Sequence, residues 1–132
     1  MTTLEKRAED LVIAVLAELA KQGVETLRMG DKDFHQHFGM ILKKFSEGPG
    51  ELQDLARQFY KNIVNGTYDE LDHALITAEQ FGFVKFPNPS YSRLTISITP
   101  RMAHHMLKEW TPEERVVLEA AARELNSCQR LR

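Results

Sequence analysis

The stretch from Thr67 to Met106 constrains the fold of this chain more than any other, because its helix start and stop signals follow one another closely. Thr67 and Glu70 form a capping box, in which the Thr67 hydroxyl accepts from the Glu70 amide and the Glu70 carboxylate accepts from the Thr67 amide. Gly82 can adopt the left-handed conformation that ends many helices. The apolar residues between these signals have helical spacing and predict a helix with one buried stripe: Tyr68, Leu71, Leu75, Ala78 and Phe81.

Two short runs after this helix predict the strands of a β-hairpin. They are residues 83–86 and residues 93–99, both rich in apolar and β-branched types. In the second run the apolar residues alternate with polar ones: Leu94, Ile96 and Ile98. The residues between the runs, 87–92, include two prolines and therefore fit a hairpin tip better than a strand ladder. One face of the hairpin is expected to be buried.

A further helix is predicted on each side of this unit. Downstream, Thr99 and Pro100 supply an N-cap and a first-turn proline for a helix that ends near Trp110. Upstream, apolar residues at helical spacing predict a helix that ends in a tight Gly turn just before Thr67: Leu52, Leu55, Phe59, Ile63 and Val64. Two helices joined by a tight turn match a helix-turn-helix, and a hairpin directly after the second helix matches a wing. Over residues 51–107 the chain therefore resembles a winged helix-turn-helix domain in its architecture.

Two more elements complete the predicted fold. Residues 24–29 predict an edge strand that would join the hairpin in a three-stranded sheet. Residues 33–45 predict an amphipathic helix, which the break at Glu47–Gly50 ends. A length of 132 residues suits a single domain, 1–132, with one core. The sequence therefore predicts an α+β, mostly α fold: a winged-helix-like bundle of about six helices with a small antiparallel β-hairpin.

The terminal helices are predicted as a dimer interface. A capping box of Thr2 and Glu5 opens the first helix, which Gly23 closes, and the apolar residues of this helix cover more than one side. Another capping box, Thr111–Glu114, opens a last helix over residues 112–126. The apolar stripe of this last helix is predicted at Val116, Val117, Ala120, Ala121 and Leu125. We expect a homodimer through these helices, with burial of both inside one chain as the alternative.

Charge and cysteine content restrict the function classes. The 17 basic and 19 acidic residues give a net charge of -2, which is not the footprint of a nucleic-acid binder. Cys128 is the only cysteine, so no internal disulfide or thiolate metal site is expected, and a reducing, cytoplasmic setting follows. The longest apolar run, Leu11 to Ala17, is too short for a membrane span, and no basic region precedes a secretory core. We therefore expect neither export nor a membrane location.

The helix before the hairpin carries acidic side chains on the face opposite its apolar stripe. In a DNA-binding winged helix this element would enter the major groove, where carboxylates repel phosphates. An acidic surface suits a basic protein partner better than DNA. The leading prediction is a non-catalytic interaction module that binds a protein partner, with these candidate residues: Asp69, Glu70, Asp72 and His73.

The alternative is a DNA-binding transcriptional regulator, the role that the winged-helix resemblance implies. The residues available for it are Lys85, Tyr91 and Arg93 on the wing, and they would contact the DNA backbone. Two cations neutralise little phosphate, so a solvated hairpin is the competing interpretation. The densest basic positions elsewhere read as solvated helix faces: Lys43, Lys44, Arg57 and Lys61.

Catalysis and metal binding have weaker support in the sequence. Asp69 and His73 are spaced i, i+4, as are His105 and Glu109, but no motif brings three or four metal ligands together. A nucleophile with its base and a Gly-rich phosphate loop are also missing from the sequence. We therefore predict no catalytic residue, no cofactor and no metal. A small metal-binding protein or enzyme is the third interpretation.

Overall fold

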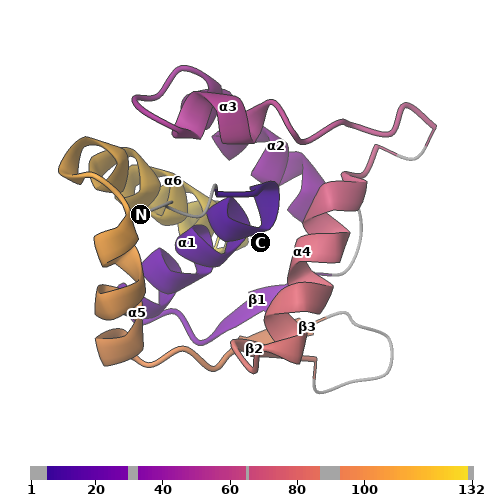
Figure 1. Ribbon diagram of the computed structural model, residues 1–132. Helices are drawn as coiled ribbons and strands as arrows, with labels where there is room; N and C mark the ends of the chain where they lie inside the picture. Colours follow the sequence, from indigo (N-terminus) through magenta and orange to yellow (C-terminus); the bar gives the residue numbers. More distant parts are fainter. Residues whose placement is uncertain (1–5, 30–32, 65, 87–92, 131–132) are drawn as a thin grey trace.

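A computed structural model describes residues 6–29, 33–64, 66–86 and 93–130 (Figure 1). Its helices are α1 (Ala8–Lys21), α2 (Asp33–Ser46), α3 (Leu52–Ala56), α4 (Asp69–Gln80), α5 (Pro100–Met106), a 3-10 turn η1 (Leu107–Glu109) and α6 (Pro112–Arg130). Its strands are β1 (Thr26–Arg28), β2 (Val84–Lys85) and β3 (Arg93–Ile96). The fold class is α+β and mostly α, as the sequence predicts.

Helix α1 lies at the centre of the molecule and packs against α3, α4, α5 and α6 (Figure 1). Every residue from Leu11 to Ala20 is buried except Ile13, which is partly buried. The prediction that this helix is buried on more than one side is confirmed, but its own chain supplies the cover. The predicted dimer interface required an exposed apolar face on α1. The chain itself covers that face, so α1 does not support the predicted interface.

The start of α1 differs from the prediction. Lys6 and Arg7 precede the helix, and the Arg7 amide donates to the Asp10 carboxylate at 2.7 Å. Arg7 is the N-cap residue of α1, and Asp10 at N3 thus supplies the reciprocal half of a capping box. The predicted capping residues, Thr2 and Glu5, lie outside the described residues.

The sheet contains the predicted third strand. Its strand order is β1-β3-β2 and both pairings are antiparallel. The side chains that face the core are all buried: Leu27, Val84, Leu94 and Ile96. β2 and β3 are shorter than the predicted runs, although the Ser97 amide still donates to the Phe83 carbonyl at 2.8 Å. The hairpin tip at 87–92 lies outside the described residues.

The helix predicted over residues 52–64 is wrong beyond Ala56. α3 ends there, and the chain continues as a projection that we call the arm, residues 57–68, of which residue 65 is not described (Figure 1). The Asn62 side chain accepts from the Val64 amide at 2.9 Å, a local turn that competes with helical hydrogen bonding. Ile63 and Val64, assigned to a buried stripe, are 97% and 94% exposed.

The arm also replaces the predicted tight turn between two helices. α3 and α4 are separated by the whole arm, so the helix-turn-helix part of the prediction is wrong in its connection. The combination of helices with a small antiparallel sheet remains compatible with a winged-helix-like arrangement.

The predicted caps of the last two helices are confirmed, and that of α4 shifts. The Thr99 hydroxyl accepts from the Met102 amide at 3.1 Å. Thr111 and Glu114 form a reciprocal capping box with distances of 2.8 Å and 3.1 Å. α4 begins at Asp69 and has Tyr68, not Thr67, as its N-cap residue.

The buried stripe of α6 differs from the predicted one. Its buried apolar residues are Leu118, Ala121, Ala122 and Leu125. Val116 is 67% exposed and Ala120 is also exposed, because α6 packs against α1 and α2 along a line rotated from the predicted stripe. Only Ala121 and Leu125 of the predicted set are fully buried.

Candidate functional site

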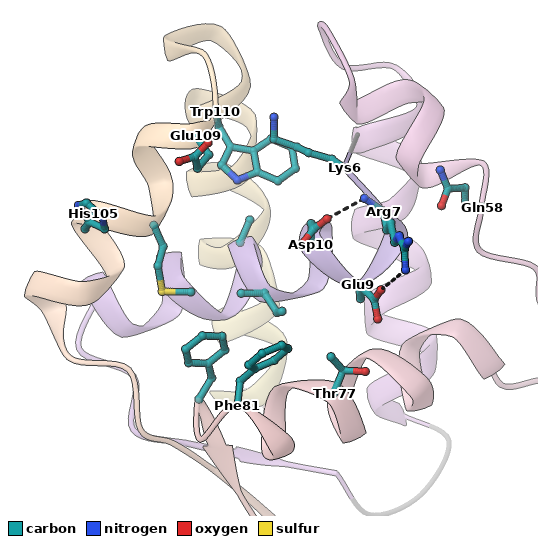
Figure 2. A pocket seen from close by; sticks show the side chains of 14 residues that line it. Lys6, Arg7, Glu9, Asp10, Gln58, Thr77, Phe81, His105, Glu109 and Trp110 are labelled. Carbon is teal, nitrogen blue, oxygen red and sulfur yellow. Dashed lines mark hydrogen bonds and ion pairs between the residues drawn. The ribbon is translucent and has the colours of Figure 1, made fainter. Parts of the chain in front are cut away.

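A groove of about 1050 Å³ lies between the N-terminal half of α1, the C-terminal end of α4, and α5 with η1 (Figure 2). Its large apolar lining residues come from three segments that are distant in sequence: Ile13, Phe81 with Phe83, and Met106 with Trp110. Figure 2 shows Thr77 and Phe81 on one side of the groove, with His105 and Trp110 on another. We take this groove as the candidate site.

Two phenylalanines form one wall of the groove. Phe81 is the C-cap residue of α4, and Gly82, with φ 79°, reverses the chain so that the Phe83 amide donates to the Ala78 carbonyl at 2.9 Å. The two rings therefore stack, with centroids 5.7 Å apart and planes at 23°. Phe81 is 67% exposed, so its assignment to the buried stripe of α4 is wrong. Its position past the last helical turn turns the ring toward the groove.

Trp110 forms the opposite wall and is held in place. Its side chain is only 5% exposed, and the Lys6 ammonium lies 5.0 Å from the ring centroid, within the range of a cation–π contact. The same ammonium pairs with Glu51 at 3.1 Å. The Lys6 charge is therefore neutralised within the chain.

Acidic side chains dominate the rim of the groove. Glu9, Asp10 and Glu109 line it, against Lys6 and Arg7. Arg7 lies 3.8 Å from Glu9, so this cation too is close to an acid of its own chain. The rim thus offers carboxylates to a ligand with positive charge.

A second hollow, of about 380 Å³, adjoins the groove and shares Arg7, Glu9 and Gln58 with it. Three residues predicted to bind a protein line this second hollow: Asp69, Glu70 and His73. His73 Nε2 lies 4.0 Å from the Glu9 carboxylate. The structure therefore brings three of the four predicted residues next to the groove and extends its acidic rim along α4.

The fourth predicted residue, Asp72, contacts a buried histidine instead. His35 is 8% exposed; its Nδ1 accepts from the Tyr68 amide at 2.9 Å, and its Nε2 lies 3.2 Å from Asp72. Because Nδ1 accepts, the neutral ring carries its proton on Nε2 and donates to Asp72. The two rings of His35 and Tyr68 also stack. His35 thus fastens α2 to the start of α4, a role that the sequence did not indicate.

Two of the three residues predicted for DNA binding lie on the face of the sheet opposite the core. Lys85 and Arg93 are exposed there, and the register places Arg28 of β1 directly opposite Arg93. Arg28 was not among the predicted residues, because the sequence did not indicate the register of β1 against β3. Its guanidinium donates to the Gln129 carbonyl at the end of α6. Tyr91 lies outside the described residues.

Two of the basic positions on the helices pair with acids of their own chain. Arg57 lies 3.9 Å from Asp54, and Lys44 lies 3.3 Å from Glu124. The Arg57–Asp54 pair, at i, i+3, fits the predicted solvated helix face, whereas the Lys44–Glu124 pair joins α2 to α6.

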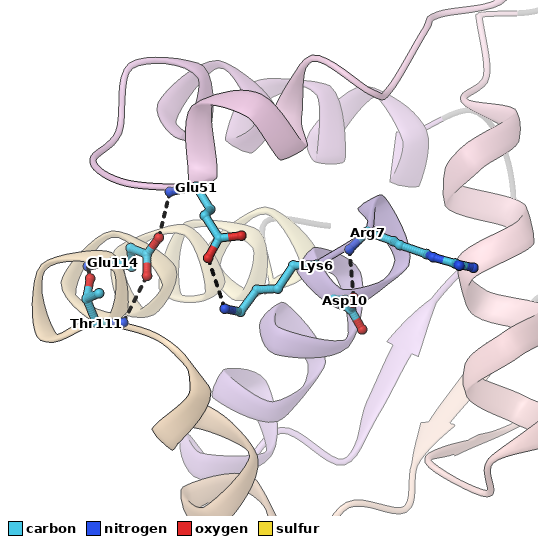
Figure 3. A network of polar contacts seen from close by, with 6 residues as sticks. All are labelled: Lys6, Arg7, Asp10, Glu51, Thr111 and Glu114. Carbon is cyan, nitrogen blue, oxygen red and sulfur yellow. Dashed lines mark hydrogen bonds and ion pairs between the residues drawn. The ribbon is translucent and has the colours of Figure 1, made fainter. Parts of the chain in front are cut away.

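Two buried carboxylates have structural partners away from the groove. Glu114, 2% exposed, accepts from the Thr111 and Glu51 amides, each at 2.8 Å (Figure 3). Glu18, 1% exposed, lies 3.4 Å from Lys21, and burial raises the pKa of Glu18 although the Lys21 charge acts to lower it. Over the part of the chain that the structure describes, no group of three or more His, Cys, Asp or Glu is placed to hold a metal ion.

Comparison with protein-family models, with curated proteins and with solved structures found no match. Among the described helices, none combines the length and the apolar character needed to cross a membrane.

Proposed function

We propose that this protein is a non-catalytic, winged-helix-like interaction module whose groove binds a basic amphipathic helix of a protein partner. The observation that carries the proposal is the combination of an apolar lining with an acidic rim that continues into the second hollow. Helices bound in grooves use apolar residues at i, i+3, i+4 and i+7 as anchors. Opposite charge around such anchors selects the partner and guides the encounter.

The groove has the size and the exposed apolar surface for such a ligand. Its volume of about 1050 Å³ lies just above the usual range for small-molecule sites and holds several side chains. Phe81 alone is 67% exposed. Covering it removes roughly 130 Å² of apolar surface from water, worth about 3 kcal/mol. This side chain is therefore expected to be a main anchor.

A pair of synthetic peptides tests the proposal. Both are fluorescein-labelled helices of about five turns with the same leucine face, and the polar face is all lysine in one and all glutamate in the other. We expect the lysine peptide to bind at least about 10-fold more tightly than the glutamate peptide in fluorescence anisotropy. Equal affinity for the two peptides would contradict the proposed charge selection.

Matched variants locate the binding surface. Phe81→Asp should weaken binding of the lysine peptide by about 10- to 100-fold, whereas Val116→Asp, at an equally exposed position on α6, should not. Asp69→Lys should weaken it too, with Glu79→Lys on the same helix as the control outside both hollows. Equal effects within either pair would place the peptide outside the groove.

A second candidate function, duplex DNA binding through the wing, is supported by a different surface. The strand register places Arg28, Arg93 and Lys85 on one exposed face of the sheet. DNA binding predicts affinity that falls steeply with salt and is lost in the double variant Lys85→Ala with Arg93→Ala. Titration of a labelled duplex at low and moderate salt separates this function from the groove.

A further inference from the structure

The end of the arm carries the most exposed large apolar side chains of the described residues. Ile63 and Val64 are 97% and 94% exposed, and Tyr60 on the same arm is 72% exposed. We call Ile63 and Val64 the arm tip. Single exposed apolar residues are common, but two adjacent branched residues at the end of a projection form a surface that gains from burial.

The arm has a defined hydrogen-bonded shape. Lys61 and Tyr68 form an isolated antiparallel bridge, and the Asn62 amide donates to the Thr67 carbonyl at 2.7 Å. The Val64 amide donates to the Asn62 side chain at 2.9 Å, which fixes the turn at the tip. The base of the arm is held through the Tyr68 amide and His35. These hydrogen bonds restrain the arm, which lowers the entropic cost of inserting the tip into a recess.

The chemistry of the tip indicates what it fits. Two branched aliphatic side chains need an apolar recess, and the neighbouring Lys61 favours an acidic rim around it. The groove of this same chain has both properties, with Phe81 in its lining and Glu9 on its rim. Because every copy of the chain carries one tip and one groove, the tip of each copy can fill the groove of the other.

We propose that a second copy of this chain inserts its arm tip into the groove, and that two copies exchange arms in a homodimer. A two-fold exchange closes the assembly, since each tip enters the groove of the other copy. This contact is proposed in place of the terminal helices, of which the chain itself covers α1. The arm of the other copy is then displaced when a partner helix enters the groove.

The inference shares the groove with the proposed function, but it does not depend on a foreign partner. Sedimentation equilibrium on the purified full chain, up to about 1 mM, measures the assembly directly. We expect the wild type to be dimeric and the double variant Ile63→Ser with Val64→Ser to be monomeric. Phe81→Asp should also be monomeric, and Val116→Asp should remain dimeric.

Mixing the two monomeric variants provides the sharpest test. A mixture of the tip variant and the Phe81→Asp variant contains one intact tip and one intact groove, on different chains. It should form a heterodimer that dissociates at least about 10-fold more readily than the wild type, because one of two contacts remains. Circular dichroism melts of each variant confirm that the fold is intact, as expected for exposed positions.

Several outcomes would overturn the inference. If the wild type is monomeric at every concentration, the proposed dimer does not exist. If the tip variant is still dimeric, the interface lies elsewhere. Loss of the dimer in Val116→Asp alone would assign it to α6. Mass that grows without limit would show an open chain of copies instead of an exchange. The lysine peptide is titrated into the tip variant, whose groove is free of the arm, so peptide binding and dimer formation succeed or fail independently.

Discussion

Replacing Glu114 by alanine should be the most destabilising single change at the junction of α3 and α6. The carboxylate is 2% exposed and accepts from two backbone amides, those of Thr111 and Glu51, each at 2.8 Å (Figure 3). Hydrogen bonds to a charged group contribute about 1.5 to 3 kcal/mol each, so the loss of both should cost about 3 to 6 kcal/mol. With an unfolding entropy near 2.1 cal/mol/K per residue, the melting temperature should fall by about 10 to 20 °C.

Urea denaturation followed by circular dichroism measures this cost. Glu113→Ala is the matched control, because it removes the same charge from the same helical turn at an exposed position. Glu114→Gln should lose at least half of the unfolding free energy that Glu114→Ala loses. Its NH₂ group faces one of the two amide donors and cannot accept from it. A difference below about 1 kcal/mol between the two alanine variants would refute the assigned role of Glu114.

Three further changes test other parts of the fold. Gly50→Ala should lower the free energy of unfolding by about 1 kcal/mol more than Gly23→Ala. Both glycines have positive φ, but only at Gly50 does an added Cβ collide with the Glu114 carboxylate. The midpoints of urea denaturation give the difference. Glu18→Gln should stabilise the protein at pH 7. The raised pKa means that the folded state holds the Glu18 proton more tightly than the unfolded state, so the stability contributed by this group is complete below the ordinary pKa of 4.5 and is lost as the pH rises through the folded value. In a series of thermal melts, the gain in melting temperature of Glu18→Gln over the wild type should therefore shrink as the pH is lowered toward 4.5. A gain that does not change with pH would contradict the raised pKa as its cause. His35→Leu should cost about 1 to 3 kcal/mol, because it leaves the Tyr68 amide without its acceptor; His35→Asn, which offers an oxygen near the position of Nδ1, should recover part of that loss in the same melts.

Two of the predicted helix caps, at Thr99 and Thr111, follow correctly from neighbouring residues, whereas the cap of α4 is Tyr68 and not Thr67. The side chains of Thr99 and Thr111 cap the helices that follow them, as their sequences indicate. A capping box needs only residues that are close in the chain, so no knowledge of the tertiary structure enters. The strand at β1 was also predicted, since its alternation is local even though its partner strand is distant.

The arm was missed because its apolar residues have helical spacing by coincidence. Phe59 of that pattern is buried, whereas Ile63 and Val64 project from the body. The local signal against a helix was Asn62, whose side chain hydrogen-bonds the backbone two residues on. Spacing alone does not distinguish an apolar residue that fills the core from one that is presented outward.

The groove could be predicted only in part, because its walls meet through tertiary packing. The acidic residues at the start of α4 follow from the helix and its exposed face, and the structure places Asp69 and Glu70 beside the groove. Phe81 and Trp110 are distant in sequence and were interpreted as parts of separate helices. Their approach depends on how α4 and α5 pack around α1, which local periodicity does not specify.

The net charge of the chain conceals a separation of charge between two surfaces. Glu9 and Asp69 lie at the hollows on the helical side, whereas Lys85 and Arg93 lie on the outer face of the sheet. The net charge of -2 is summed over the whole chain, so it does not indicate the sign of the charge on either surface. Exposed charges separated by more than about 10 Å are largely screened at physiological salt. The sign of each surface, and not the net charge of the chain, therefore determines which ligand it attracts, and a basic helix and an anionic ligand would be bound at different places.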